Sequence, residues 1–566
     1  MEKFFDSHLH ATLKHHFASN TKDVSAWDTL STRDYSSNFS GFRGKVTLFF
    51  LKNFIEGTLR SQSSLTQLIQ SKYDLCLMSL YSPDKDLLKA LYEHPEFRNI
   101  IDRVWFGKIL SGKRLESLIS TDNHFKILLE DLKLLKEPNT AGKVNFLSTK
   151  DSFDTSPETL NLVFAVEGLH CLRSNTSLTE SSSILADIGS SIQMIQSQGA
   201  KIVSSTITHI DNENQLFANQ AYAMDGMRAM GLDDVPLRPT GNGFRPLGIR
   251  AIHLLEHHSI CTDIKHLSVQ ARKDLYAHRD SNSMDSPILC THAGLAGIPF
   301  EGSSNSYQNH IIDAQLVRSK VKVANAVEDI EHMQVTLAKP IAAKNNLFGT
   351  VGFNCSSINL YDEDVKQIYD SSGLLGISLD ARILGYVSLF GLHNHNQALP
   401  YVKEFTHKGH SYKLLTDTEF FSLDEFSRLG LQAQRADSWF DDCLNYHNLH
   451  PIIGGKGSAG HYTQFLHFMA NVLHATRLAQ QWDGLAGVEK MLLQTLCIGS
   501  DFDGLIDSIR YGTDCTRIDF LKKRFEKDFK SSAKRFGISL PKSLTSKMVG
   551  DHIFYHNGKN FVLSRL

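Results

Sequence analysis

Short apolar runs with the length of a β-strand recur along the whole chain. Helix-like segments, such as residues 248–258 and 362–371, separate several of these runs. Eight buried strands that alternate with helices predict an α/β protein with a parallel barrel, the (β/α)8 TIM-type fold. The predicted strands are residues 3–11, 72–83, 159–168, 200–209, 259–268, 287–294, 373–380 and 495–504.

The chain has 566 residues, whereas a barrel of this type needs about 250. We therefore expect a single barrel over residues 1–566 with large insertions, although a separate small domain within them is an alternative. Such insertions follow the carboxyl ends of the strands, the face that carries active sites, so they are expected to wall or cover a pocket. The insertions are residues 12–71, 84–158, 295–372 and 381–494.

The C-terminal segment, residues 505–566, is expected to form helices that pack on the barrel. Lys and Arg residues between positions 510 and 535 are interleaved with apolar ones, a pattern typical of an amphipathic helix. The basic residues could contact an acidic partner, but a solvated helix face explains them more simply. The interleaved apolar residues are Phe520, Leu521, Phe525 and Phe529.

Charge and cysteine content narrow the class of protein. Lys and Arg number 59 against 61 Asp and Glu, so no net field favours nucleic acid or an anionic membrane, and a small-molecule substrate is expected. No signal peptide or apolar membrane span is recognised, so a cytoplasmic location is expected. The eight cysteines form no C-x-x-C pair, which argues against disulfides and a cysteine-ligated zinc.

Histidines and carboxylates gather at the ends of the predicted strands. His8 and His10 are two apart at the end of the first strand, and this spacing sends both side chains to the same face. A lone His-x-His pair is more often solvated or structural than a metal site. Five later strands also end in such a group, which core histidines do not explain. These groups are Glu167, His209, His266, His292 and Asp501.

The types of these side chains predict a metal-dependent enzyme. Neutral imidazoles together with carboxylates suit zinc, manganese or iron. The candidate ligands outnumber the four that one zinc ion usually takes, which indicates two divalent metal ions. We expect both ions to be zinc.

The order and the amino-acid sequence of these segments resemble those of the membrane (renal) dipeptidase family of the amidohydrolase superfamily. The matching segments are VEGLH at 166–170, ITH at 207–209, CTDIKHLS at 261–268, THAG at 291–294, NLYDEDV at 359–365, GLLG at 373–376 and GSDFDG at 499–504. The resemblance implies that His209 contacts the substrate carbonyl and that Asp501 moves protons. It also implies a metal-ligand set with Glu167 as the bridge, namely His8, His10, Glu167, His266 and His292.

The chain departs from the family pattern at two positions. The family usually has His-x-Asp on its first strand, where this chain has His10 as the second residue. It also places an arginine shortly after the histidine of strand six, to hold the substrate carboxylate, and none stands after His292 here. Arg318 or Lys265 are the alternatives for that role. By the same resemblance, a homodimer is plausible.

The expected activity is hydrolysis of an amide bond in a small substrate, a dipeptide above all, by a metal-activated water. An N-acyl amino acid, a lactam or a lactone is an alternative substrate of the same superfamily. A catalytically silent barrel that serves as a binding protein is the alternative of another class. Of the two acidic residues in the last strand segment, Asp501 is expected to act on substrate and Asp503 to serve a turn.

Overall fold

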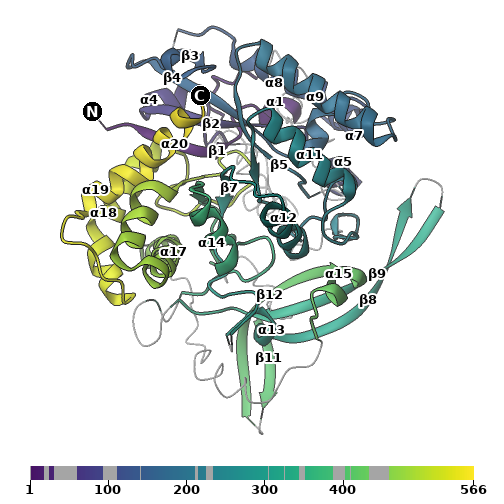
Figure 1. The fold of residues 1–566 in the computed structure, drawn as a ribbon, viewed down its shortest axis with the longest axis vertical. Coiled ribbons are helices and arrows are strands. Elements are labelled where there is room, and N and C mark those ends of the chain that lie inside the picture. The colour runs from purple at the N-terminus through teal and green to yellow at the C-terminus, as the bar shows by residue number, and fades with distance from the viewer. Residues whose placement is uncertain are drawn as a thin grey trace, which may run out of the picture.

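A computed structural model gives the fold of most of the chain (Figure 1). It describes residues 2–17, 24–30, 60–93, 111–140, 142–210, 215–224, 234–303, 305–323, 326–342, 348, 351–386, 402–407, 410–432 and 458–566. Eight parallel strands form one curved sheet in the order β1-β2-β4-β5-β6-β7-β10-β13. They are β1 (Phe4–Leu9), β2 (Tyr73–Leu80), β4 (Thr159–Val166), β5 (Ile202–Thr206), β6 (Cys261–Asp263), β7 (Ile288–Ala293), β10 (Leu375–Ile377) and β13 (Leu496–Ile498).

The sheet closes on itself into a nearly complete barrel. The first and last strands meet just past their ends, where Asp501 N donates to His8 O at 2.9 Å and His10 N donates to Phe502 O at 2.9 Å. Each of the eight strands lies inside one of the eight predicted apolar runs, so the predicted (β/α)8 fold is confirmed. Closure brings the carboxyl ends of all eight strands to one rim.

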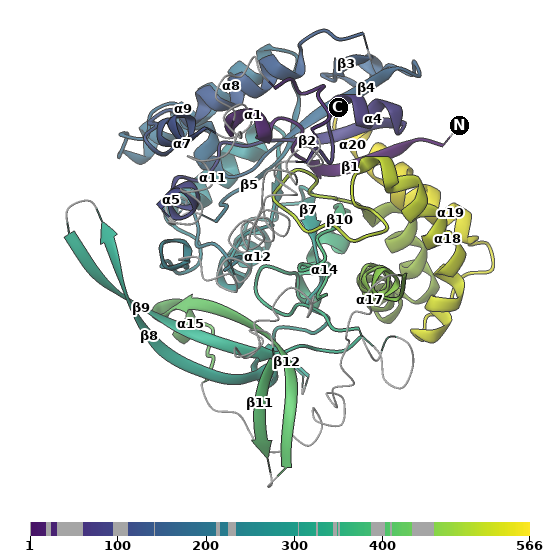
Figure 2. The same cartoon turned by 180° about the vertical axis from the view of Figure 1, so that it is seen from behind.

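Helices surround the barrel and cover the outer faces of its strands (Figures 1 and 2). A short strand, β3 (Lys143–Phe146), pairs with the start of β4 outside the barrel path. The helices are α1 (Leu13–Phe17), α4 (Leu65–Gln70), α5 (Lys85–Glu93), α7 (Gly112–Ile119), α8 (His124–Leu135), α9 (Ser181–Ser197), α11 (Pro246–His257), α12 (Val269–Ser281), α13 (Tyr307–His310), α14 (Asp362–Asp370), α15 (Leu423–Arg428), α17 (Ser458–Lys490), α18 (Ile518–Arg535), α19 (Ser546–Asp551) and α20 (Asn557–Arg565).

The C-terminal helices lie against the barrel beside its first strand. Helix α18 buries Leu521, Phe525 and Phe529, whereas the side chain of Phe520 is 46% exposed. Lys522 on the same helix reaches Glu2, with 3.0 Å between Nζ and Oε1. These contacts join the end of the described chain to its beginning.

A second sheet stands apart from the barrel and is antiparallel, in the order β11-β12-β9-β8. Its hairpin of β8 and β9 projects away from the body (Figures 1 and 2). Helix α15 follows β12 and returns the chain to the barrel, where Glu425 accepts hydrogen bonds from Ser268 Oγ at 3.0 Å and Gly243 N at 3.2 Å. The strands are β8 (Ile311–Val323), β9 (Ala326–Ala338), β11 (Val402–His407) and β12 (His410–Ser422).

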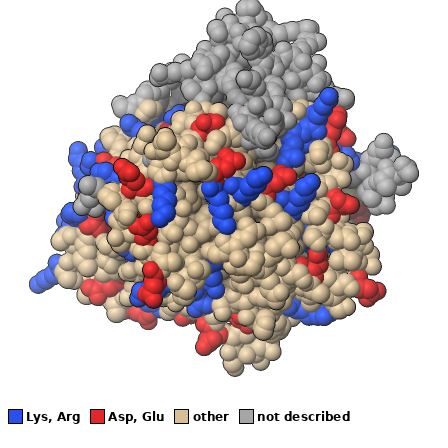
Figure 3. Space-filling view, turned by 90° about the horizontal axis from the view of Figure 1, so that it is seen from above, with Lys and Arg blue, Asp and Glu red and all other residues tan. Residues whose placement is uncertain are grey.

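The surface carries both signs of charge. Seen from above, Lys and Arg side chains are interspersed with Asp and Glu over the described part of that face (Figure 3). Within the described residues, every helix is too short or too polar to cross a membrane.

Candidate metal centre

The seven side chains that the sequence singles out meet at the carboxyl rim of the barrel. Each lies in the last positions of its strand or within three residues after it, because the apolar strands fill the lumen below and leave the rim to polar groups. All seven residues belong to one cluster, namely His8, His10, Glu167, His209, His266, His292 and Asp501.

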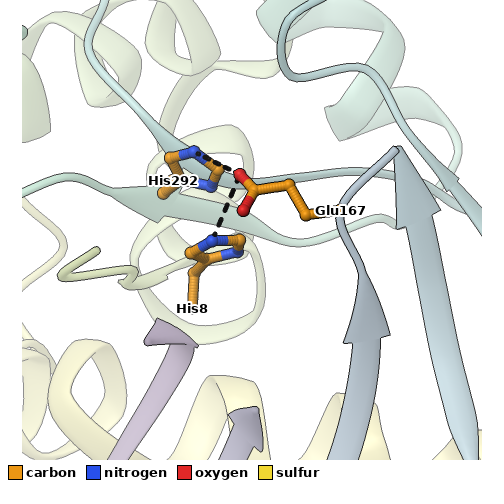
Figure 4. Close-up of side chains that lie close together, drawn as sticks. All are labelled: His8, Glu167 and His292. Atoms are coloured by element: carbon orange, nitrogen blue, oxygen red, sulfur yellow. Dashed lines mark ion pairs between the residues drawn. The ribbon is translucent and has the colours of Figure 1, made fainter. Parts of the chain in front are cut away.

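Glu167 lies at the centre of this cluster and is 3% exposed. Figure 4 shows His8 and His292 directed at its carboxylate from two different strands. His8 Nε2 is 3.5 Å and His292 Nε2 is 3.6 Å from Glu167 Oε1. His266 Nε2 and His209 Nε2 approach the same oxygen at 3.3 Å and 3.5 Å. One carboxylate therefore faces histidines from four strands.

His10 and Asp501 extend the cluster toward the seam between the first and last strands. His10 Nε2 lies 3.2 Å from Glu167 Oε2, 3.5 Å from Asp501 Oδ1 and 3.1 Å from His8 Nε2. Two imidazole nitrogens that face each other with carboxylate oxygens beside them form a donor set typical of a cation site.

The spacing of these atoms fits a metal ion. Zinc bound at about 2.0–2.1 Å in a tetrahedron separates its ligand atoms by about 3.3 Å. The nitrogen and oxygen atoms that converge on Glu167 are 3.1–3.6 Å apart. Three overlapping groups can each hold an ion, namely His8 with Glu167 and His292, His8 with His10 and Asp501, and Glu167 with His209 and His266.

Without a bound ion, the electrostatics favour the metal-binding protonation state at Glu167, His266 and His292 but not at His10. Burial opposes the charge on His10, but Glu167 and Asp501 raise its pKa to about 10. Burial opposes ionisation of Glu167, but the facing imidazoles of His209, His8 and His10 hold the pKa of its carboxyl well below its usual range. Burial lowers the pKa of His266 to about 3 and that of His292 well below its ordinary value. A carboxylate and neutral imidazoles are the forms that coordinate zinc.

A second set of groups orients His8. Thr291 Oγ1 donates to Asp263 Oδ2 at 2.5 Å and lies 3.0 Å from His8 Nδ1. Because the hydroxyl proton goes to Asp263, the hydroxyl oxygen accepts from His8 Nδ1, and the lone pair of Nε2 faces Glu167. Sequence reasoning missed Asp263 and Thr291, although both flank predicted ligands.

The backbone is strained at two residues of the cluster. His266 has a φ of 67° and Asp501 a φ of 61°, in the left-handed region that costs a residue with a side chain about 1–3 kcal/mol. Hydrogen bonds hold these turns, because His266 O accepts from Ala221 N at 2.7 Å and Asp501 N donates to His8 O at 2.9 Å. Strained backbone that is over-determined in this way is concentrated at functional sites.

The two candidates for the missing arginine have different surroundings. Arg318 is 73% exposed on the projecting hairpin and pairs with Glu331 at 2.7 Å. Lys265 is 3% exposed, and its ammonium donates to Ile358 O at 3.3 Å. Within the described part of the chain, Lys265 has no carboxylate within 4.0 Å. Burial lowers the pKa of Lys265, and an anionic group beside it would favour the charged ammonium, so Lys265 is the better candidate for binding such a group.

Two further residues at the rim were missed by sequence reasoning. Asp84 accepts a hydrogen bond from His209 Nδ1 and another from the Tyr81 hydroxyl at 2.6 Å. Their positions were the available signal, since Tyr81 and Asp84 stand at and just after the end of the second predicted strand.

Comparison with known proteins gave matches only among solved structures, since no family model and no curated protein matches the chain. A dipeptidase of metallopeptidase family M19 is 11% identical with a TM-score of 0.42, covering 100% of this chain and 98% of that one. A metallopeptidase from Rhodobacter sphaeroides, solved with a phosphinate mimic of L-Ala-D-Ala, is 12% identical with a TM-score of 0.44, covering 100% and 99%. A probable dipeptidase of Pseudomonas aeruginosa is 10% identical with a TM-score of 0.42, covering 100% and 96%.

Proposed function

We propose that this protein is a metal-dependent hydrolase that cleaves the amide bond of a small substrate, and that a dipeptide is its first candidate substrate. The observation that carries the proposal is the convergence of histidine Nε2 atoms on the two oxygens of Glu167, at the spacing of ligands on one ion. The carboxyl rim of a (β/α)8 barrel is where such enzymes carry their active sites.

Five side chains would hold two divalent ions, with zinc as the expected metal and Glu167 shared between them. When bound, the two ions supply a water of lowered pKa and polarise the substrate carbonyl. The proposed ligands are His8, His10, Glu167, His266 and His292.

The remaining two side chains would act on substrate. His209 would donate a hydrogen bond from Nε2 to the carbonyl oxygen, because its other nitrogen is engaged by Asp84. Asp501 would accept a proton from the attacking water and return it to the leaving amine. Burial raises the pKa of Asp501, which suits a carboxyl group that must release a proton again.

Lys265 would bind the substrate carboxylate in place of the family's arginine. Peptides with a free carboxyl terminus should then be cleaved faster than their amides. Lys265→Met should erase this preference by raising KM for the free acid, and Lys265→Arg should keep it. N-acyl amino acids also carry a carboxylate and are the second class to test, whereas lactams and lactones without one should be poor substrates.

The test of the proposed function is metal analysis of the purified protein, followed by a screen of dipeptides and N-acyl amino acids. We expect close to two transition-metal ions per chain and turnover of at least one dipeptide. Glu167→Gln should lose both, because an amide is a poor bridging ligand. A protein that carries no metal, and binds none when zinc or manganese is added, would be a binding protein and not a hydrolase.

A further inference from the structure

Asp84 is a buried carboxylate at the rim that neither binds metal nor touches substrate in the proposed reaction. It follows β2 at the start of the next helical segment, and its side chain is fully buried. Its Oδ2 atom accepts from His209 Nδ1 and from the Tyr81 hydroxyl, and its Oδ1 atom lies 3.8 Å from His170 Nε2. Burying a carboxylate costs free energy, so a buried carboxylate with several polar partners is a candidate for a functional role.

The ring of His209 is fixed by its surroundings. Asp84 binds Nδ1 on one side, and Nε2 on the other side lies 3.5 Å from Glu167 Oε1. The ring packs edge-on against Tyr81 and His266, with centroids 4.9 Å and 4.2 Å apart. Nε2 is therefore the ring nitrogen that faces the cluster.

The loop that carries Asp84 is itself firmly attached. Ser82 N donates to Cys171 Sγ at 3.2 Å, and Ser82 Oγ bonds His124 Nδ1 at 2.8 Å. His170 Nε2 lies 3.0 Å from Ser82 O. These bonds join the loop to helix α8 through His124 and to the short 3-10 helix η6 (Leu169–Leu172), which begins two residues after Glu167. Asp84 is thus held at a fixed position relative to Glu167, the residue at the centre of the cluster.

We propose that Asp84 is a positioning residue that aims Nε2 of His209 at the substrate carbonyl, and that Tyr81 holds Asp84 in place. The inference rests on the proposed function only for the identity of the group that His209 meets. A ring that donates at both nitrogens carries a positive charge, which the Asp84 carboxylate balances. Partners that orient a metal-binding histidine are worth about 10- to 100-fold in activity, and we expect the same scale for a histidine that contacts substrate.

The test uses full-length, metal-loaded protein and the variants Asp84→Asn, Tyr81→Phe and His209→Ala. Asparagine has the shape of aspartate, so the fold should survive. We expect Asp84→Asn to keep its metal and to lower kcat about 10- to 100-fold with little change in KM. Tyr81→Phe should give a smaller loss. In the double variant with His209→Ala, Asp84→Asn should cause no additional loss, because its effect passes through His209.

The matched control is Asp131→Asn. Asp131 also pairs with a buried histidine, since its Oδ1 atom lies 2.8 Å from His16 Nε2, and it is 1% exposed on helix α8 outside the cluster. Losing a buried histidine partner at that position should leave kcat unchanged. An equal loss in Asp131→Asn and Asp84→Asn, or additive losses in the double variant, would overturn the proposal.

A second readout does not depend on the reaction. In protein labelled with 15N-histidine, the Nδ1 proton bound to Asp84 should give a downfield resonance, assigned by its loss in His209→Ala. The resonance should shift or vanish in Asp84→Asn and persist in Asp131→Asn. If it is unchanged in Asp84→Asn, the inference fails even if the protein hydrolyses dipeptides. If the resonance behaves as expected but dipeptides are not cleaved, the proposed function is the part that fails.

Discussion

Asp501 and Asp503 are two positions apart, yet their carboxylates face different parts of the molecule. Asp501 Oδ1 lies 3.5 Å from His10 Nε2, inside the histidine cluster. Asp503 accepts from Gln62 N and Ser63 N, each at 2.9 Å, and from Lys14. Both residues have a positive φ, so the backbone turns at each of them. Asp503 therefore secures the loop at residues 62–63, and Asp501 is left to the site.

This difference predicts the behaviour of two matched variants. Asp501→Asn should keep the fold and most of the metal while turnover falls by about two orders of magnitude or more, the usual scale for losing a general acid or base. Asp503→Asn should reduce the free energy of unfolding but act more mildly on turnover. Kinetics, metal analysis and thermal melting of both proteins measure this. Normal turnover in Asp501→Asn would remove the proton-transfer role.

His209 and His266 both approach Glu167 Oε1, so distance alone does not separate their roles. Their outer nitrogens differ, since Nδ1 of His209 is bound to Asp84 whereas Nδ1 of His266 has no hydrogen-bond partner among the described residues. A carboxylate on the outer nitrogen supports either role, so the proposed roles are separated by experiment. His209→Ala should keep both ions and lose turnover, and His266→Ala should lose metal. Elemental analysis of the two variants measures their metal content. Equal metal loss in both would show that His209 is a metal ligand.

The sequence was sufficient to find the residues of the cluster but not all of their supports. His8, Glu167 and His292 could be predicted because parallel strands end at a common rim and each of these residues stands at a strand end. Asp84 could not be linked to His209, because the two are 125 positions apart and no local pattern connects them. Which side chains pair across a barrel depends on how all of its strands close into a ring, and the sequence of a single segment does not predict that.

At the scale of elements, the strands of the barrel were easier to predict than those of the second sheet. Barrel strands are buried on both faces and appear as continuous apolar runs. Strand β8 instead alternates exposed and half-buried side chains at its described positions, with Leu316 48% exposed. Its partner β9 pairs with β12, about 80 positions further along. A sheet whose pairing spans such distances leaves little local signal in the sequence.

Glu419 on β12 makes the junction of this sheet sensitive to pH. The side chain is completely buried and accepts from the Tyr307 hydroxyl and from Ser357 N at 2.8 Å. Burial raises the pKa of its carboxyl to about 7. Since the folded protein holds this proton more tightly than the unfolded chain, the stabilisation is complete below about pH 4.5 and is lost as the pH rises through 7.

Glu419→Gln should therefore change how stability depends on pH. The amide stays neutral, so the difference in free energy of unfolding between the variant and the parent protein should favour the variant more at pH 8 than at pH 5. Urea denaturation at the two pH values measures this difference. A constant difference between the two proteins would show that Glu419 does not titrate in this range.

At the scale of the whole molecule, bound metal should stabilise the fold. The proposed ligands come from four different strands of the barrel, so ions that bind the folded state would oppose the opening of the ring. An ion at about 1,000 times its Kd adds about 4 kcal/mol. Chelation should lower the Tm of the parent protein by several degrees, and zinc should restore it. Glu167→Gln should melt at the same temperature with and without chelator.

The seam between β1 and β13 also has a consequence for biosynthesis. His8 and Asp501 come within 4.0 Å of each other, although every strand from β2 to β10 is translated between them. The ribosome must therefore synthesise β13 before His8 can meet Asp501. A nascent chain released before β13 would expose an unpaired strand edge and would lack Asp501, so it would contain all five proposed ligands without the residue proposed to move protons.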